Sequence, residues 1–274
     1  MNGYDVLVAV GPDGVHEGAL DLAVAEAERR GTGVLLMHVV HGLGDTQDLD
    51  QALTAVGHSV LTDAAGQLEG RIPFTTEIAT GPAAVTLAER AASDGLVVLE
   101  RRDAGTMERL LTMSVSTRVA AHAKAPVVVV PSGWRPAVEP LPIIVGVDDP
   151  HLDDGQLRTA VALARSTKRR LVVMYAVWLP EAYQGIAVGD ERTRWVEQGT
   201  AAAQATLERI GAADVEVDVD VRWQRPVDGL VAATRRASML VLGRRSGRFG
   251  VHLGALTRTV LRHAEGPVMV VDRA

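Results

Sequence analysis

The chain has 274 residues, of which 47% are hydrophobic and 23% are charged, and this length is sufficient for two domains that each bury a core. It contains no cysteine, which excludes a disulfide framework, thiol catalysis and cysteine-based zinc or iron–sulfur sites. The formal net charge of -6 disfavours general nucleic-acid binding, because phosphate contacts need a basic surface.

The opening segment MNGYDVLVAV carries an apolar run that is short and lacks a preceding basic stretch, so we expect no signal peptide. No apolar segment approaches the roughly 20 residues that a membrane-spanning helix needs. The sequence therefore predicts a cytoplasmic protein with neither a membrane nor a nucleic-acid partner.

The first half alternates strand-like and helix-like patterns. Runs of β-branched residues predict strands at residues 4–10, 34–40, 73–79, 96–99 and 126–131. Between the first two, Leu20, Ala23, Val24 and Ala27 recur at helical spacing and form a stripe that can pack on a sheet. Continuous apolar runs such as VVVV are typical of strands buried on both faces of a parallel sheet.

The second half repeats the first. VLVAV in the first half corresponds to IIVGV at an offset of 137 residues, LVVLERR to MLVLGRR at 143, and HAKAPVVVV to HAEGPVMVV at 141. The segment between the copies, PSGWRPAVEPLP, is rich in proline and glycine. We therefore predict a first domain at 1–132, a linker at 133–141 and a second domain at 142–274.

Alternation of strands and helices with short connections predicts, for each copy, an open α/β fold with right-handed crossovers. The motifs also resemble the universal stress protein family, and the whole chain looks like a tandem universal stress protein. The resemblance rests on the opening strand followed by an aspartate, on the MHVV and MYAV strands, and on the C-terminal module. That module consists of a glycine loop, a helix, an HA…P motif and a valine strand.

The resemblance implies two tandem domains, each with an open, doubly wound, five-stranded parallel sheet of the adenine-nucleotide-hydrolase type. In nucleotide-binding members, ATP lies at the carboxyl ends of the strands, where open α/β sheets generally bind ligands. The family's phosphate loop follows the fourth strand and has the pattern Gly-x-x-Gly, nine residues, then Gly-Ser or Gly-Thr. Glycines there allow close backbone approach, and main-chain amides donate to the phosphates.

The second copy retains much of this pattern. The residues expected to bind ATP, with Mg²⁺ as its counterion, are Asp148, Gly243, Gly247, Gly254 and Thr257. The match is incomplete, because the loop is two residues shorter than the family pattern.

Two loop positions also differ from the pattern, since Ser246 holds the second glycine position and Ala255 replaces the first hydroxyl residue. Arg244, Arg245 and Arg248 could compensate by charge, because arginine pairs well with phosphate oxygens. The alternative is a glycine-rich turn with solvated arginines.

The first copy departs further from the family pattern. Glu100 occupies the first loop glycine, Met113 the closing glycine, and Gly11 the position of the aspartate. A carboxylate facing the phosphates would repel them. Ser114 and Ser116 are more simply explained as residues that satisfy free amides at a helix N-terminus. We expect no ATP site in this copy.

The resemblance implies a regulatory stress-response module rather than a metabolic enzyme. One alternative is a scaffold of the same fold that binds no nucleotide. Another is a slow ATP hydrolase, for which the sequence suggests no general base or nucleophile. The aspartates within 147–154 could assist Mg²⁺ binding or serve as solvated turn and N-cap residues.

The resemblance also implies that the two copies pair with each other through their last strands, at residues 127–130 and 268–271, and a homodimer is a further arrangement that the sequence allows. Such pairing would cover an apolar sheet edge.

Overall fold

The computed structural model describes residues 4–41, 47–91, 95–101, 114–149, 154–178, 190–247 and 250–273. The chain divides into two compact units, a first unit at Met1–Pro136 and a second unit at Ala137–Ala274.

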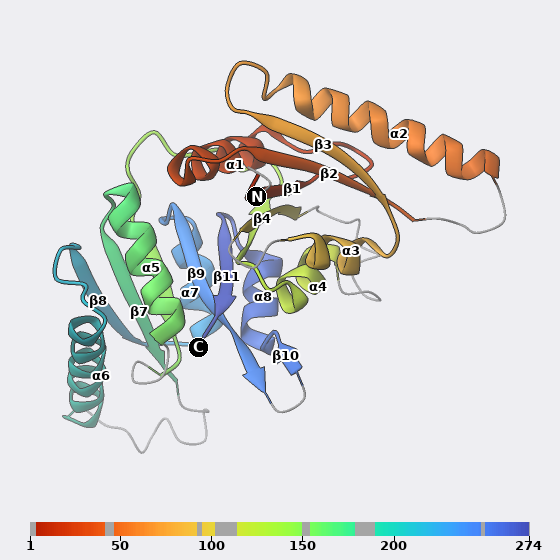
Figure 1. The fold of residues 1–274 in the computed structure, drawn as a ribbon. Coiled ribbons are helices and arrows are strands. Elements are labelled where there is room, and N and C mark those ends of the chain that lie inside the picture. The colour runs from red at the N-terminus through yellow and green to blue at the C-terminus, as the bar shows by residue number, and fades with distance from the viewer. Residues whose placement is uncertain are drawn as a thin grey trace. The chain divides into compact units, whose positions relative to one another are not determined.

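The first unit alternates strands and helices along the chain (Figure 1). Its elements are β1 (Val6–Ala9), α1 (Glu17–Arg30), β2 (Val34–Val40), α2 (Gln47–Gly66), β3 (Phe74–Thr80), α3 (Ala83–Arg90), β4 (Leu96–Arg101), α4 (Val115–His122) and β5 (Val127–Pro131).

The strands of the first unit form a parallel sheet in the order β3-β2-β1-β4-β5. Helices α1 and α2 cover one face of this sheet, and α3 and α4 cover the other (Figure 1). Since β1 lies between β2 and β4, the strand order reverses between β1 and β4, which is the position where open α/β sheets bind ligands.

The second unit repeats this arrangement. Its elements are β6 (Ile143–Val147), α5 (Asp154–Thr167), β7 (Leu171–Val177), α6 (Asp190–Arg209), β8 (Val217–Trp223), α7 (Pro226–Thr234), β9 (Met239–Gly247), β10 (Gly250–His252), α8 (Ala255–His263) and β11 (Val268–Asp272). The order of its parallel strands is β8-β7-β6-β9-β11, and β10 pairs antiparallel with β9. The expected fold, two doubly wound five-stranded parallel sheets, is confirmed.

Helix α1 shows how the sequence pattern builds each layer. The predicted stripe of Leu20, Ala23, Val24 and Ala27 is buried, because it is the face of the helix that packs on the sheet. The helix ends at Gly31, which has a positive φ of 66° and donates its amide to carbonyls of the last turn. Glycine adopts this left-handed conformation without the steric penalty of a side chain.

Candidate functional site

The second unit contains a cavity of about 210 Å³ at the carboxyl ends of β6 and β9. These neighbouring strands are where the strand order of the unit reverses, which is the general ligand position of such sheets. The N-terminus of α8 forms another part of the wall. The residues that line the cavity are Gly146, Val147, Asp148, Met174, Ala176, Pro226, Leu230, Leu242, Gly243, Gly254, Ala255, Leu256, Thr257 and Arg273.

Four of the five residues expected from the sequence meet in this cavity. Asp148 directly follows β6, Gly243 lies within β9, and Gly254 and Thr257 belong to the start of α8. The fifth, Gly247, lies at the end of β9, where it pairs with Gly250 of β10.

The segment after Gly243 differs from the loop expected there. Strand β9 continues to Gly247, and β10 returns antiparallel to it, with Val251 opposite Ser246 and His252 opposite Arg245. Pairing with a neighbouring strand engages alternate backbone amides in the ladder, and the engaged amides are no longer available as phosphate ligands. The expected cradle is therefore a β-hairpin over its described residues, and Arg248 lies outside them.

Arg244 does not provide the compensating charge that the sequence suggested. Its side chain is only 1% exposed, and its Nε donates to Oδ1 of Asp272 over 2.6 Å. Neither Arg244 nor Asp272 lines the cavity. The arginine instead joins β9 to β11, so the expectation of a phosphate contact from Arg244 is wrong for this structure.

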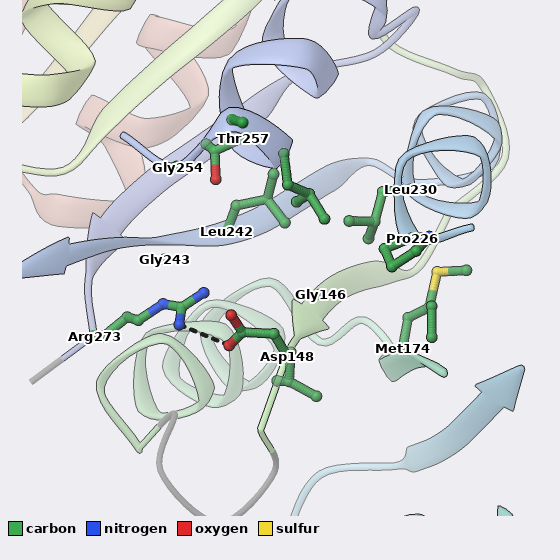
Figure 2. Close-up of a pocket in the computed structure, with 14 residues that line it drawn as sticks. Gly146, Asp148, Met174, Pro226, Leu230, Leu242, Gly243, Gly254, Thr257 and Arg273 are labelled. Atoms are coloured by element: carbon green, nitrogen blue, oxygen red, sulfur yellow. Dashed lines mark ion pairs between the residues drawn. The ribbon is translucent and has the colours of Figure 1, made fainter. Parts of the chain in front are cut away.

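The cation that does line the cavity is Arg273, which the sequence reasoning missed. Its Nη1 lies 2.6 Å from Oδ1 of Asp148, and the two side chains point toward one another (Figure 2). The ion pair is partly accessible, with side-chain exposures of 24% for Arg273 and 40% for Asp148. Among its described lining residues, the cavity thus carries a carboxylate and a guanidinium in direct contact.

An apolar wall, also missed from the sequence, faces the cavity. It is formed by Met174, Leu230 and Leu242, with Pro226 at the start of α7 (Figure 2). A Cβ on Gly146 would lie 2.6 Å from a methyl group of Leu230, so the absence of a side chain there lets the leucine pack against β6. An apolar wall beside a few polar groups is the usual composition of a small-molecule site.

Gly243 has a structural reason to be glycine. Gln156 is fully buried, and its Nε2 donates to the carbonyl of Gly146 over 2.9 Å. A Cβ on Gly243 would lie only 2.0 Å from Oε1 of Gln156 and 2.5 Å from Cγ of Arg273. Both side chains occupy the space beside Gly243, so the glycine accommodates them whether or not a ligand is bound.

One ionisable group beside the cavity is shifted. Burial raises the pKa of Tyr175 above its ordinary value, and the negative charges of Asp149 and Asp148 raise it further. Both effects disfavour the phenolate. Tyr175 lies on β7 between the lining residues Met174 and Ala176, so its ionisation reports on charge near the site.

The first unit has a cavity of about 270 Å³ at the corresponding place, lined among others by Gly11, Glu100, Ser114 and Ser116. The side chain of Glu100 is 7% exposed and accepts a hydrogen bond from the backbone amide of His16 over 2.9 Å. The imidazole of His16 also pairs with this carboxylate. The carboxylate that the sequence places at this position is therefore in the wall of the cavity, and the structure adds that it is buried.

Ser114 caps helix α4, as expected. Its hydroxyl accepts from the backbone amide of Thr117 over 3.3 Å and contacts the hydroxyl of Ser116. In the second unit, the N-cap of α8 is Gly254, which offers no side-chain cap. Met113, the expected obstacle to phosphate binding in the first unit, lies outside the described residues.

Comparison with known proteins identifies the family. The model of the universal stress protein family matches residues 5–131 and again residues 141–272. The chain belongs to the universal stress protein family. It carries two tandem domains of this family, whose members are generally regulators rather than enzymes.

Two mycobacterial relatives have similar sequences. A universal stress protein of Mycolicibacterium smegmatis is 29% identical over 98% of this chain and 97% of its own length. One from Mycobacterium tuberculosis is 29% identical over 78% of this chain and 69% of its own length. Both similarities extend over more of this chain than either of its two domains alone.

Among solved structures, a universal stress protein from Archaeoglobus fulgidus superposes with a TM-score of 0.71 at 18% identity. The superposition covers 100% of this chain and 99% of that one, and it supports the fold. In the part of the chain that the structure describes, no helix is both long and apolar enough to cross a membrane.

Proposed function

We propose that this universal stress protein is a regulatory module whose second domain binds an adenine nucleotide. The observation that carries the proposal is the cavity at the carboxyl ends of β6 and β9, which combines Asp148, the uncapped N-terminus of α8 and an apolar wall. Bound nucleotide would order this end of the domain and favour one state of a surface that a partner protein recognises.

The residues present fit the parts of a nucleotide. The apolar wall of Met174, Leu230 and Leu242 suits a base, and the carboxylate of Asp148 can accept hydrogen bonds from ribose hydroxyls. The first amides of α8 and its helix dipole favour a phosphate group. A Cβ on Gly254 would meet no protein atom within 4 Å, so space for a ligand remains beside this N-terminus.

ATP is the proposed nucleotide, as the family resemblance implies, and Mg²⁺ would enter with it. Mg²⁺ is usually held by one or two carboxylates together with phosphate oxygens. The first domain is proposed to bind no ATP, because Glu100 places a buried carboxylate in the wall of its cavity.

Isothermal titration calorimetry with ATP and Mg²⁺ tests the proposal on the wild type, Gly254→Glu and Gly66→Glu. Gly254 and Gly66 both have open space where a Cβ would lie, but Gly66 belongs to the first unit and lines no described cavity. We expect Gly254→Glu to abolish binding and Gly66→Glu to leave it unchanged. Absence of heat from the wild type at millimolar ATP would contradict the proposal.

The second candidate function is a scaffold that binds no nucleotide, and the β9–β10 hairpin in place of a phosphate loop favours it. The titration above distinguishes the two, since a scaffold gives no heat with ATP. Slow ATP hydrolysis is a separate possibility, which release of inorganic phosphate above the rate of a Gly254→Glu control would reveal.

We also propose that the last strands of the two domains, β5 and β11, pair with each other, and that the protein acts in the cytoplasm. Parallel pairing on one side engages only alternate amides of a strand, so an unpaired edge exchanges the remaining amides rapidly. Hydrogen exchange should therefore protect every amide at Val127–Val130 and Val268–Val271. Fast exchange of alternate amides in both strands would overturn the pairing.

A further inference from the structure

We propose that Arg273 makes the second domain select a phosphorylated ligand over the corresponding nucleoside. The inference rests on the proposed function and assigns the specificity of that site to one residue. Arg273 is the only cation among the described residues that line the cavity. Since Arg244 is directed to Asp272 instead, the guanidinium of Arg273 is the positive charge that the described lining offers to a phosphate.

Arg273 is held in place by its backbone. The amide of Gly155, at the start of α5, donates to the carbonyl of Arg273 over 2.8 Å. A Cβ on Gly155 would lie 2.4 Å from that carbonyl oxygen, so a side chain at this position would prevent the contact. The residue that follows β11 is thereby fixed against the start of α5.

The side chain of Arg273 also occupies space that the absence of a side chain at Gly243 leaves open. A Cβ on Gly243 would lie 2.5 Å from its Cγ and 2.7 Å from its Nε. Gly155 and Gly243 come from different elements, α5 and β9, and both approach the same arginine. Gly155 leaves room for the backbone carbonyl of Arg273, and Gly243 leaves room for its side chain. Both glycines therefore help to hold the guanidinium at the cavity.

The ion pair with Asp148 is the contact that a phosphate would replace at Arg273. An arriving phosphate carries more negative charge than one carboxylate and matches the planar fork of a guanidinium. The phosphate would attract Arg273 and leave Asp148 able to accept hydrogen bonds from the ribose. One ion pair therefore supplies both contacts when a nucleotide enters.

The first domain provides an internal contrast. The repeat aligns Arg273 with Ser132, Gly243 with Glu100 and Asp148 with Gly11. At the positions that hold the cation and its adjoining glycine in the second domain, the first domain has a hydroxyl group and a buried carboxylate. The cation thus distinguishes the second site from the first.

The test compares AMP with adenosine by calorimetry on the full chain, for the wild type, Arg273→Gln and Arg273→Lys. Charge-assisted hydrogen bonds predict a preference for AMP of about 10- to 100-fold in the wild type. In Arg273→Gln this preference should fall below about threefold while adenosine affinity is retained. Arg273→Lys should fall between the two, since lysine keeps the charge but loses the planar fork.

Three outcomes are distinguishable. Loss of the AMP preference in Arg273→Gln, with a thermal unfolding midpoint close to that of the wild type, supports the inference. An undiminished preference in a folded Arg273→Gln variant overturns it and leaves the proposed function intact. If AMP, ATP and adenosine all fail to bind the wild type, the proposed function itself fails, and the inference fails with it.

Discussion

Arg244 and Asp272 lie directly opposite each other on neighbouring parallel strands, and the arginine donates from Nε over 2.6 Å and from Nη2 over 3.2 Å. The pair joins β9 to β11. Because Arg244 is buried, removing the carboxylate of Asp272 deprives a poorly solvated cation of this charge partner. We expect Asp272→Ala to lower the free energy of unfolding by about 2 kcal/mol, measured by urea denaturation.

The control for this prediction is Asp218→Ala, because Asp218 pairs with Arg170 on the surface and both side chains are about half exposed. Exposed ion pairs contribute little, so this variant should unfold close to the wild-type midpoint. Equal midpoints for Asp272→Ala and the wild type would show that the Arg244 pair does not stabilise the second unit.

Gly243→Ala should destabilise the second unit, because its Cβ would lie 2.0 Å from Oε1 of the fully buried Gln156. Overpacking of this kind typically costs about 1–3 kcal/mol. Truncation of Gln156 to alanine should relieve the closest overlap in the double variant, although the overlap with Arg273 remains, so a double-mutant cycle should show a favourable coupling. Strictly additive effects in thermal unfolding would contradict a direct clash.

Gly254→Ser should change stability and ligand affinity in opposite directions. Gly254 has φ −60° and ψ 155°, nearly the angles of Ser114, which are −58° and 153°. A serine there can accept from the amide of Thr257 as Ser114 does from Thr117, which stabilises the helix by a few tenths of a kcal/mol.

The same substitution occupies an amide that a phosphate would use, so AMP should bind more weakly to Gly254→Ser. Thermal unfolding and calorimetry measure the two effects on one sample. Gly254→Ala is the control, since it adds the Cβ without the hydroxyl. Unchanged AMP affinity in Gly254→Ser would show that the phosphate does not use the start of α8.

Much of the fold could be predicted from the sequence, because its main signals are local. The β-branched runs predicted the strands, and the stripe at Leu20, Ala23, Val24 and Ala27 predicted the buried face of α1. The internal repeat then predicted that the second half of the chain has the same fold as the first half. Each of these signals depends on residues close together in the chain.

The parts of the site that were missed depend on long-range geometry. Asp148 and Arg273 are 125 residues apart in the sequence of the second unit. They meet because the strand order brings β11 beside β9 and β9 beside β6. The available sequence signal was the contrast of Arg273 with Ser132 in the repeat. The hairpin was missed because glycine-rich segments suit both loops and tight strand pairs.

We expect Tyr175 to make the free energy of unfolding of the second unit pH-dependent in alkali. Its ring packs beside Gly199 on α6, and burial raises the pKa of Tyr175 above its ordinary value of 10.0, with Asp149 and Asp148 raising it further. Above pH 10 the unfolded chain therefore binds fewer protons than the native protein, so the free energy of unfolding falls as pH rises through the native pKa.

Tyr175→Phe should reduce this alkaline loss of stability, measured as the difference between urea midpoints at pH 9 and above pH 10. Spectrophotometric titration of tyrosine ionisation provides a second measurement. Asp149→Asn should lower the pKa of Tyr175 more than Asp148→Asn, since Asp149 exerts the larger electrostatic effect. A larger decrease of the Tyr175 pKa in Asp148→Asn than in Asp149→Asn would contradict this placement of the two carboxylates around Tyr175.

Asp148→Asn should separate the two proposed roles of the ion pair. The variant removes the carboxylate that lies 2.6 Å from Arg273, so the guanidinium no longer has to exchange one anion for another when phosphate enters. Pyrophosphate should therefore bind more tightly to Asp148→Asn than to the wild type, by up to about tenfold. Adenosine should bind more weakly, because an amide is a poorer acceptor for ribose hydroxyls than a carboxylate.

The control is the double variant Arg273→Gln/Asp148→Asn. It should lose the gain in pyrophosphate affinity, since this gain requires the guanidinium of Arg273. If pyrophosphate affinity rises equally in the double variant, the effect comes from removal of negative charge alone, and Arg273 is not the group that recognises the phosphate.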